Sequence, residues 1–181
     1  MKLKRAQATV FLAILSVATS VTVFPRAASE KLTTVIKRSD LIAVGTVTNL
    51  ITVNGYRVAR LQIEDMLKGS ASVREALFLA SPTWTCDISN AQTGERALYF
   101  LSLAKKDSEF PTQHNGQPVY LIQHSGYGRM LSADEGKFRL TSLITLPEGF
   151  PKEESRTQNN ERFTLIASVD IVRLIRLNRT N

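Results

Sequence analysis

The sequence predicts a mainly β protein, built as a small antiparallel barrel with a short N-terminal helix and a C-terminal helix. Six short runs rich in β-branched and aromatic residues follow one another at a spacing of about ten residues, with turn residues between them. Helical periodicity occurs only at the two ends of the region after residue 28. A closed barrel also removes the sheet edges that an exported β protein would otherwise have to protect.

The two predicted helices cover residues 29–40 and 168–178. In each of them, apolar residues recur on one face. Ser29 precedes the first apolar face and Ser168 precedes the second, and serine is a preferred N-cap residue. Each helix is therefore expected to begin with a serine cap.

A long β-hairpin is the clearest local prediction. Residues 41–53 are β-branched and partly alternating, and residues 56–67 alternate with one slip of phase. Asn54-Gly55 between them is the strongest short signal for a type I′ turn, because both residues tolerate positive φ. A β-bulge near Val58 would absorb the slip.

Four further strands are expected, over residues 75–81, 96–104, 119–124 and 137–144. The run at 96–104 is almost continuously apolar, which is typical of a strand buried on both faces. Residues 147–162 are polar, have no apolar period and are expected to form a linker to the last helix.

One apolar phase of these strands is expected to face the interior of the barrel, because side chains alternate between the two faces of a strand. The residues of this phase are Ala43, Val47, Leu61, Ile63, Leu77, Leu98 and Phe100.

Residues 1–28 have the three-part pattern of a secretory signal peptide. A cationic start is followed by an apolar run that is short for a membrane span, and then by small residues such as Ser16 and Ala18 at peptidase spacing. We therefore expect cleavage between about residues 18 and 28. The alternative is an uncleaved anchor reaching Phe24, which would then be the only contact with a membrane.

Two regions are expected to follow the leader. Residues 29–146 would form the barrel domain, and residues 147–181 would form the polar linker with the C-terminal helix. The protein is expected to be exported, either to the periplasm or to the medium.

The net charge argues against a nucleic-acid partner. The chain carries a formal charge of +7, but loss of Lys2, Lys4 and Arg5 with the leader leaves 20 basic against 16 acidic residues. The remaining cations are dispersed along the sequence rather than gathered in a basic stripe with aromatic residues. A solvated, mildly basic surface is the simpler interpretation.

Three segments carry a resemblance to a known family: SDLIAVGTVTNL, RLQIEDMLKGS and SPTWTCDISNAQTGERALYFLSLA. Their anchors are Gly45, the Leu67-Lys68-Gly69 strand ending, and the turn at residues 93–96. Over residues 30–145 the chain resembles bacterial exported netrin-like domains, whose fold is similar to the N-terminal domain of tissue inhibitors of metalloproteinases. The resemblance implies a five-stranded OB barrel. These anchors are features of fold, and one fold hosts many functions.

The chain departs from this family at the residue that would carry inhibition. In the animal inhibitors, the resemblance implies a cysteine at the mature N-terminus that chelates the zinc of the protease. This sequence has no cysteine near any expected mature N-terminus. No residue here inherits an inhibitory role.

Cys86 is the only cysteine and allows three interpretations. It is a buried or inert thiol, it forms an intermolecular disulfide that links a dimer, or it is a nucleophile with His124 or His114 as base. The neighbouring Asp87 is an unfavourable environment for a reactive thiolate. A structural or intermolecular role is therefore expected.

Trp84 is the only tryptophan and lies in the same segment as Cys86. It either plugs one end of the barrel or serves as an exposed binding anchor, and we favour the plug. Trp84 and Cys86 are nevertheless the two candidate interaction residues.

No metal, cofactor or catalytic residue is expected. His114 and His124 lack ligand partners at a suitable spacing, and both are expected to be solvated beside turns. Glu64 and Asp65 are neighbours on a strand and should point to opposite faces. The pair at 134–135 is expected in a solvated turn.

The resulting functional hypothesis is an exported, non-enzymatic binding module for an unknown protein or envelope component. The alternative is a secreted thiol-dependent hydrolase that uses Cys86.

Overall fold

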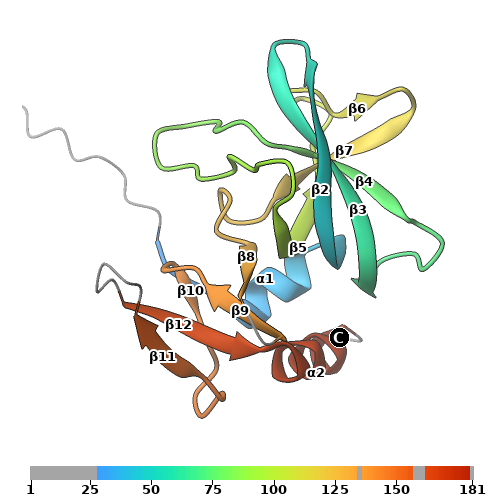
Figure 1. Cartoon of the computed structure of the whole chain (residues 1–181). Helices are drawn as coiled ribbons and strands as arrows, with labels where there is room; N and C mark the ends of the chain where they lie inside the picture. Colours follow the sequence, from blue (N-terminus) through green and yellow to red (C-terminus); the bar gives the residue numbers. More distant parts are fainter. Residues whose placement is uncertain (1–27, 134–135, 157–161, 180–181) are drawn as a thin grey trace, which may run out of the picture.

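Figure 1 shows the computed structural model of the chain, which describes residues 28–133, 136–156 and 162–179. The fold is mainly β, with a ten-stranded sheet, a two-stranded sheet and two helices among the described residues. The prediction of a mainly β protein with one helix near each end is confirmed. The expected leader, apart from residue 28, lies outside the described residues, as does the pair at 134–135.

The elements follow one another in this order: β1 (Glu30–Lys31), α1 (Leu32–Arg38), β2 (Leu41–Val53), β3 (Tyr56–Lys68), β4 (Glu75–Leu79), β5 (Arg96–Leu103), β6 (Gln113–His114), β7 (Gln117–Ile122), β8 (Arg129–Ala133), β9 (Lys137–Leu140), β10 (Ile144–Thr145), β11 (Glu153–Arg156), β12 (Arg162–Ala167) and α2 (Ser168–Asn178).

The predicted long hairpin is present as β2 and β3, which pair antiparallel along most of their length. Its turn residues Asn54 and Gly55 have φ angles of 51° and 83°, as a type I′ turn requires. The sequence therefore predicts this element correctly, including its turn.

The predicted bulge near Val58 is wrong. The extra residue that shifts the register in this part of the hairpin is Thr48 of β2. A further irregularity at Glu64 of β3 lets Glu64 and Asp65 line the same groove. The expectation that these two carboxylates point to opposite faces is therefore also wrong, because a bulge breaks the alternation of side chains.

Strand β5 organises the large sheet because it pairs with three strands, β2, β7 and β8. Starting from β5, the pairings run through β2, β3, β4 and β7 and return to β5. All of these pairs are antiparallel except β4 with β7, which is parallel. On its other side, β5 continues through β8 to β9, β12 and β11.

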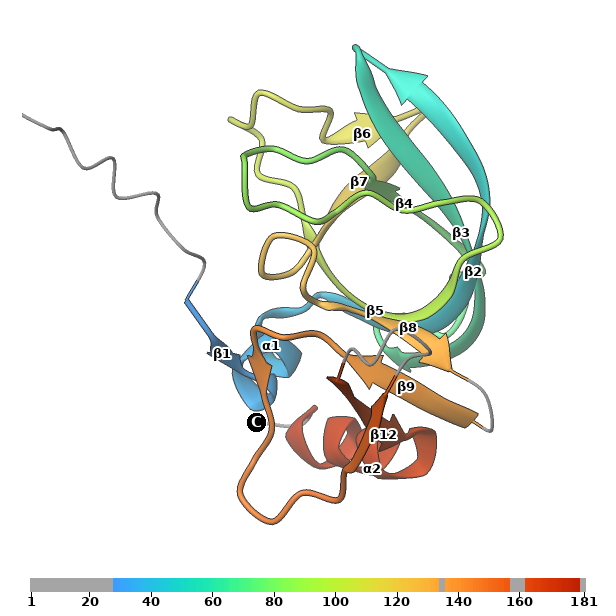
Figure 2. The ribbon, with the colours of Figure 1, turned by 60° about the vertical axis from the view of Figure 1, so that its left-hand side comes forward.

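Both faces of β5 are buried, as its apolar sequence predicts. Ala97, Tyr99 and Leu101 join a cluster formed mostly by β2, β3, β4 and β5. Leu98 and Phe100 join a second cluster with residues of both helices. In Figures 1 and 2, α2 lies beside β9 and β12, at the end of the molecule away from the hairpin tip.

The burial of the seven expected core residues is confirmed, since each is at most 6 % exposed. They do not share one interior, however. Leu98 and Phe100 lie in the cluster with the helices, and Leu77 lies in a third, smaller cluster. Strands β2 and β5 are apolar on both faces, so alternation alone does not distinguish one buried side from the other.

The part of the sheet beyond β8 differs most from the prediction. The expected strand 137–144 is divided into β9 and β10 by a turn in which Ile144 N donates to the carbonyl of Thr141. The expected linker at 147–162 contains β11, and β12 follows from Arg162. Strand β8 was not predicted. These strands are short and polar on one face, so their sequences resemble loops until they pair.

Both helices occur where expected, but neither has its predicted cap. The N-cap position of α1 is Lys31 rather than Ser29, and that of α2 is Ala167 rather than Ser168. Neither cap forms a side-chain hydrogen bond to its helix. Buried Ile171 and Ile175 hold α2 against the protein, because tertiary packing stabilises short helices more than their ends do.

Candidate functional site

The two candidate interaction residues, Trp84 and Cys86, lie together in the segment between β4 and β5. This segment has no helix or strand, yet a single carboxylate orders it. Buried Asp87 accepts hydrogen bonds from Thr83 N (2.8 Å), Thr83 Oγ1 (2.7 Å) and Ser89 N (2.8 Å). Hydrogen bonds to a charged group are stronger than neutral ones, so Asp87 fixes the loop that carries Trp84.

The second part of the site is a strained segment after β7. His124, Ser125 and Gly126 all have left-handed backbone conformations, with φ angles of 53°, 52° and 87°. Such a conformation costs of the order of 1–3 kcal/mol for each residue other than glycine, and it persists only where the surroundings enforce it. Left-handed strain is concentrated at functional sites in proteins, which makes this segment a candidate.

The Trp84 loop supplies the contacts that hold the strained segment. Trp84 Nε1 donates to Ser125 Oγ (3.0 Å), and Ile88 N donates to the carbonyl of Ser125 (3.0 Å). Gly126 lies so close to the loop that a Cβ atom there would collide with the backbone of Ile88 and Ser89. The two segments are therefore held against each other, and we call residues 83–89 together with residues 124–126 the Trp84 surface.

Trp84 itself is exposed over 38 % of its surface, and Ile88 over 37 %. This exposure is inconsistent with a buried plug and favours the alternative of a surface anchor. Its hydrogen bond to Ser125 fixes the indole while part of its apolar surface stays in contact with solvent. Tryptophan in such a position is a typical anchor of protein interfaces.

Cys86 is half-buried and lies in a turn in which Asp87 N donates to the carbonyl of Trp84. Its thiol is thus neither fully enclosed nor fully presented to solvent. Because it is the only cysteine in the sequence, a disulfide within the chain is impossible.

His124 is not solvated, contrary to expectation: its side chain is 16 % exposed. Its Nδ1 lies 3.3 Å from Glu30 Oε2, while Nε2 is buried and has no hydrogen-bond partner among the described residues. Its backbone is left-handed, a conformation that histidine adopts more often than most residues do, but no local sequence pattern marks His124 for it.

A cavity of about 250 Å³ adjoins the Trp84 surface and is lined by Asp87, His124, Ser125 and Ser89, among others. These residue types are those of a catalytic serine site, but their hydrogen bonds are not. The recorded contacts of the Asp87 carboxylate are with Thr83 and Ser89, whereas His124 faces Glu30. Asp87 therefore does not orient His124, whose neighbouring carboxylate is that of Glu30.

Arg129 lies behind the loop and connects it to β5. Its Nη2 donates to the carbonyl of Ile88 (3.2 Å), and its Nη1 lies 3.4 Å from Glu95 Oε1. Glu95 also accepts a hydrogen bond from the hydroxyl of Tyr99 (3.0 Å). Burial, followed by the charge of Glu95, raises the pKa of Tyr99 well above its usual range.

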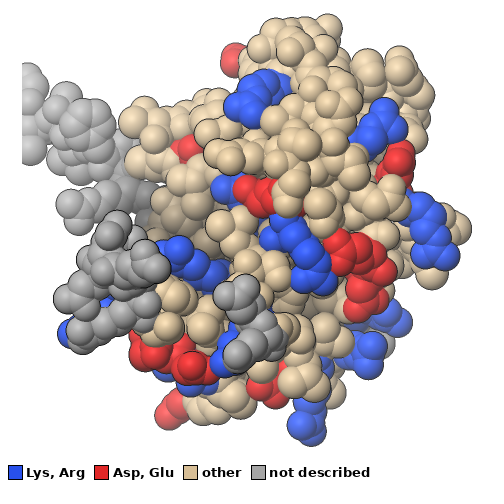
Figure 3. All heavy atoms as spheres, in the orientation of Figure 1, with Lys and Arg blue, Asp and Glu red and all other residues tan. Residues whose placement is uncertain are grey.

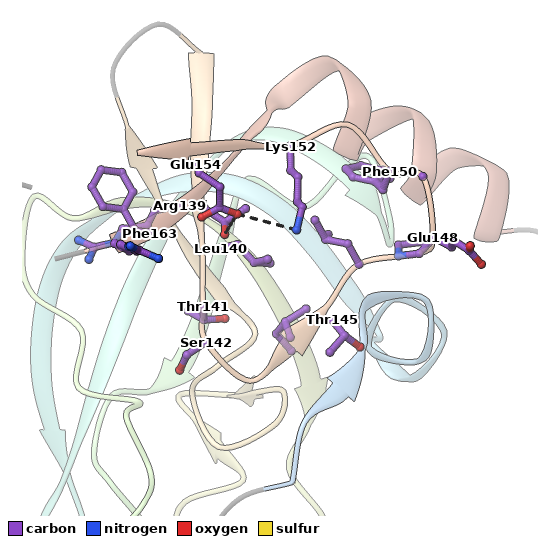
Figure 4. A pocket seen from close by; sticks show the side chains of 16 residues that line it. Arg139, Leu140, Thr141, Ser142, Thr145, Glu148, Phe150, Lys152, Glu154 and Phe163 are labelled. Carbon is purple, nitrogen blue, oxygen red and sulfur yellow. Dashed lines mark hydrogen bonds and ion pairs between the residues drawn. The ribbon is translucent and has the colours of Figure 1, made fainter. Parts of the chain in front are cut away.

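A larger cleft, of about 800 Å³, lies between β9, β10 and β12 and the loop before β11 (Figure 4). Arg139 and Phe163 lie on one side of it and Phe150 on the other, with Lys152 and Glu154 between them. The sequence did not predict this cleft, because much of it belongs to the expected linker.

The polar groups of this cleft are largely engaged with one another. The guanidinium carbon of Arg139 lies 4.6 Å from the centre of the Phe163 ring. Glu154 accepts a hydrogen bond from Thr164 (3.1 Å) and lies 3.8 Å from Lys152. Thr145 donates to the backbone of β1. The cleft therefore offers mixed charge.

Charge does not gather on the face shown in Figure 3, where lysine and arginine alternate with aspartate and glutamate over the described residues. Within the same residues, no group of three or more His, Cys, Asp or Glu could hold a metal ion. No helix of the described chain is long and apolar enough to cross a membrane.

Comparison of the sequence with protein-family models gives no match, and neither does comparison with curated proteins.

Proposed function

We propose that this protein is an exported, non-enzymatic binding module that recognises a protein of the cell envelope through the Trp84 surface. The observation that carries this proposal is the state of Trp84: its indole is exposed, yet a hydrogen bond to a strained segment fixes it. Aromatic anchors of this kind contribute most of the binding energy of many interfaces.

Rigidity supports binding because it lowers the entropic cost of association. Immobilising one side chain at an interface costs about 0.5–1.5 kcal/mol. The hydrogen bonds of Asp87 and Ser125 order the loop before any partner arrives. The contacts of Asp87 favour this role, since its hydrogen bonds stabilise the loop that carries Trp84.

The proposed scaffold is an OB-like barrel formed by β2, β3, β4, β7 and β5. The cycle of pairings and the parallel contact between β4 and β7 support it. Gly45 supports it as well, because any larger residue there would collide with the carbonyl of Gln62 on the neighbouring strand. The domain that contains this barrel would extend over residues 29–146, and its fold agrees with the netrin-like resemblance.

Export is proposed from the leader alone. Residues 1–28 combine a cationic start, an apolar run and small residues at peptidase spacing. An envelope or extracellular protein is therefore the proposed partner class. A disulfide-linked dimer through half-buried Cys86 remains part of the proposal, because oxidising compartments allow such bonds.

The test is capture from the native envelope fraction by the immobilised chain, with Trp84→Ala beside wild type. We expect Trp84→Ala to weaken binding of the captured partner at least tenfold, since loss of a tryptophan hot spot costs about 2 kcal/mol or more. Repeating the capture with and without reductant reports whether a disulfide bond of Cys86 contributes to binding.

The matched control is Leu103→Ala, which removes an apolar side chain that is 50 % exposed on β5, outside the Trp84 surface. This variant should bind as wild type does. Equal binding by Trp84→Ala and wild type, or an equal loss in both variants, would contradict the proposal.

A further inference from the structure

A groove of about 490 Å³ lies between the outer face of α2 and the sheet. Its floor includes Val44 and Phe138, which also belong to the core cluster packed against the helices. Its wall is formed by Val169, Val172 and Leu177 of α2. No residue that lines this groove lines the cavity at the Trp84 surface.

Helix α2 is apolar on more than the face that the fold requires. Ile171 and Ile175 are fully buried and attach the helix to the protein. Val169 and Leu177 lie on the other side and are 70 % and 66 % exposed, the highest values among the exposed large apolar residues. Most of the surface of these two side chains meets solvent, so packing within the described part of the chain does not explain their apolar character.

Among the described residues, cations outnumber carboxylates in the lining of the groove. Arg96 is neutralised by Glu64, at 2.8 Å, and Lys137 by Glu153, also at 2.8 Å. Arg173 and Arg176 line the same groove, and neither has an ion-pair partner among the described residues. Two guanidinium groups thus lie next to an apolar floor, with Asp65 as the remaining carboxylate of the lining.

This combination defines the chemistry of an occupant. The volume lies within the range of about 300–1,000 Å³ that small-molecule sites have in proteins. The floor and wall would bury an alkyl chain, and each buried methylene contributes about 0.8 kcal/mol. Guanidinium groups bind carboxylates through paired hydrogen bonds.

We propose that the groove binds a single-chain alkyl carboxylate. Its chain would lie over Val44 and Phe138, and its carboxylate would face Arg173 and Arg176.

The experiment is titration calorimetry of the purified chain with dodecanoate below its micellar concentration. We expect saturable binding to one site. Butanoate, which has the same carboxylate without the long chain, should bind at least tenfold more weakly. Dodecyltrimethylammonium, which has the chain but the opposite charge, should also bind at least tenfold more weakly.

Two variants locate the site. The double substitution Arg173→Glu and Arg176→Glu should weaken dodecanoate binding at least tenfold. Val169→Glu, at a position too exposed to disturb folding, should weaken it as well. Lys105→Glu with Lys106→Glu makes the same change of charge at exposed positions outside the groove and should leave binding unchanged.

Four outcomes would overturn the proposal. These are the absence of dodecanoate binding to wild type, equal affinity for dodecyltrimethylammonium, an equal loss in the lysine control, and a wild-type dimer in sedimentation that Val169→Glu converts to monomers. The last result would make the groove an interface between two copies of the chain.

Discussion

The carboxylate of Asp87 shows how one side chain can define a surface. Its oxygens accept hydrogen bonds from Thr83, which precedes Trp84, and from Ser89, which follows Cys86 in the same loop. A buried carboxylate is costly unless its hydrogen bonds are complete, so the loop closes around it in one conformation. The conformation of the loop that carries Trp84 therefore depends on the hydrogen bonds of Asp87.

Cys86→Ser is expected to leave the folded state and envelope binding largely intact. The side chain is half-buried and its replacement is nearly isosteric, so the free energy of unfolding should fall by less than about 1 kcal/mol. Chemical denaturation and the capture assay measure both quantities. A folded variant that has lost a measurable turnover would contradict the non-enzymatic proposal, whereas loss of a dimer on non-reducing gels would identify an intermolecular disulfide.

The raised pKa of Tyr99 predicts how the stability of the protein changes at alkaline pH. Burial and the nearby Glu95 raise the pKa of its phenol in the folded state, while in the unfolded chain it titrates near its usual value of about 10. Stability from this group is complete below about pH 10 and is lost as the pH rises further, by about 1.4 kcal/mol per pH unit.

Tyr99→Phe should remove the part of the loss of unfolding free energy at alkaline pH that comes from this phenol. The variant is expected to lose about 1 kcal/mol at neutral pH with its hydrogen bond to Glu95, but to have a flatter dependence of unfolding free energy on pH above about 10. Urea unfolding at several pH values, with tyrosinate absorbance as a second signal, measures the slopes. Equal slopes for variant and wild type would show that Tyr99 ionises without unfolding.

Among the elements, the His124–Gly126 segment depends most on tertiary contacts. Gly126→Ala would require an unfavourable left-handed alanine, at about 1–2 kcal/mol, and would also push the backbone of Ile88 and Ser89 away. We expect a larger loss of unfolding free energy than the conformational cost alone, together with weaker capture of the partner. Denaturation and the capture assay report the two effects.

Gly116→Ala provides the control for this change. Gly116 has a similar φ of 76°, but nothing lies within 4 Å of the position that a Cβ would occupy. The difference between the two variants therefore isolates the contact with the Trp84 loop. Equal destabilisation, with unchanged capture by both, would mean that this contact does not support the binding surface.

Elements whose signal is local could be predicted from the sequence. The β2–β3 hairpin follows from apolar alternation and Asn54-Gly55, and α2 follows from its apolar stripe. Strand β11 could not be predicted, because its sequence EESR becomes a strand only by pairing with β12. Within the site, Trp84 was a candidate from its residue type, whereas the conformation of Ser125 depends on contacts 41 positions away.

At the scale of the whole molecule, Phe100 connects the β5 strand to the layer of helices. It is fully buried in the cluster that includes residues of α1 and α2. Phe100→Ala should lower the free energy of unfolding by about 3–5 kcal/mol, which is the usual cost of removing a buried phenylalanine. Urea denaturation followed by circular dichroism measures this loss.

Leu103→Ala on the same strand is the comparison, because half of that side chain is exposed. Its unfolding free energy should lie within about 0.5 kcal/mol of the wild-type value. A loss below about 1 kcal/mol for Phe100→Ala would place this side chain on the surface and contradict the assignment of its strand.

The triple pairing of β5 has a consequence for how the protein opens. Separating the helical layer from the sheet would expose one face of β5, and separating β2 or β7 would expose its other face and its backbone amides. Neither the helical layer nor the strands paired with β5 can separate fully without exposing β5 to solvent. The helical layer and the sheet therefore form one cooperative unit. Hydrogen exchange at the β5 amides then requires global unfolding, whereas the amides of β11, at the edge of the sheet, exchange through local fraying.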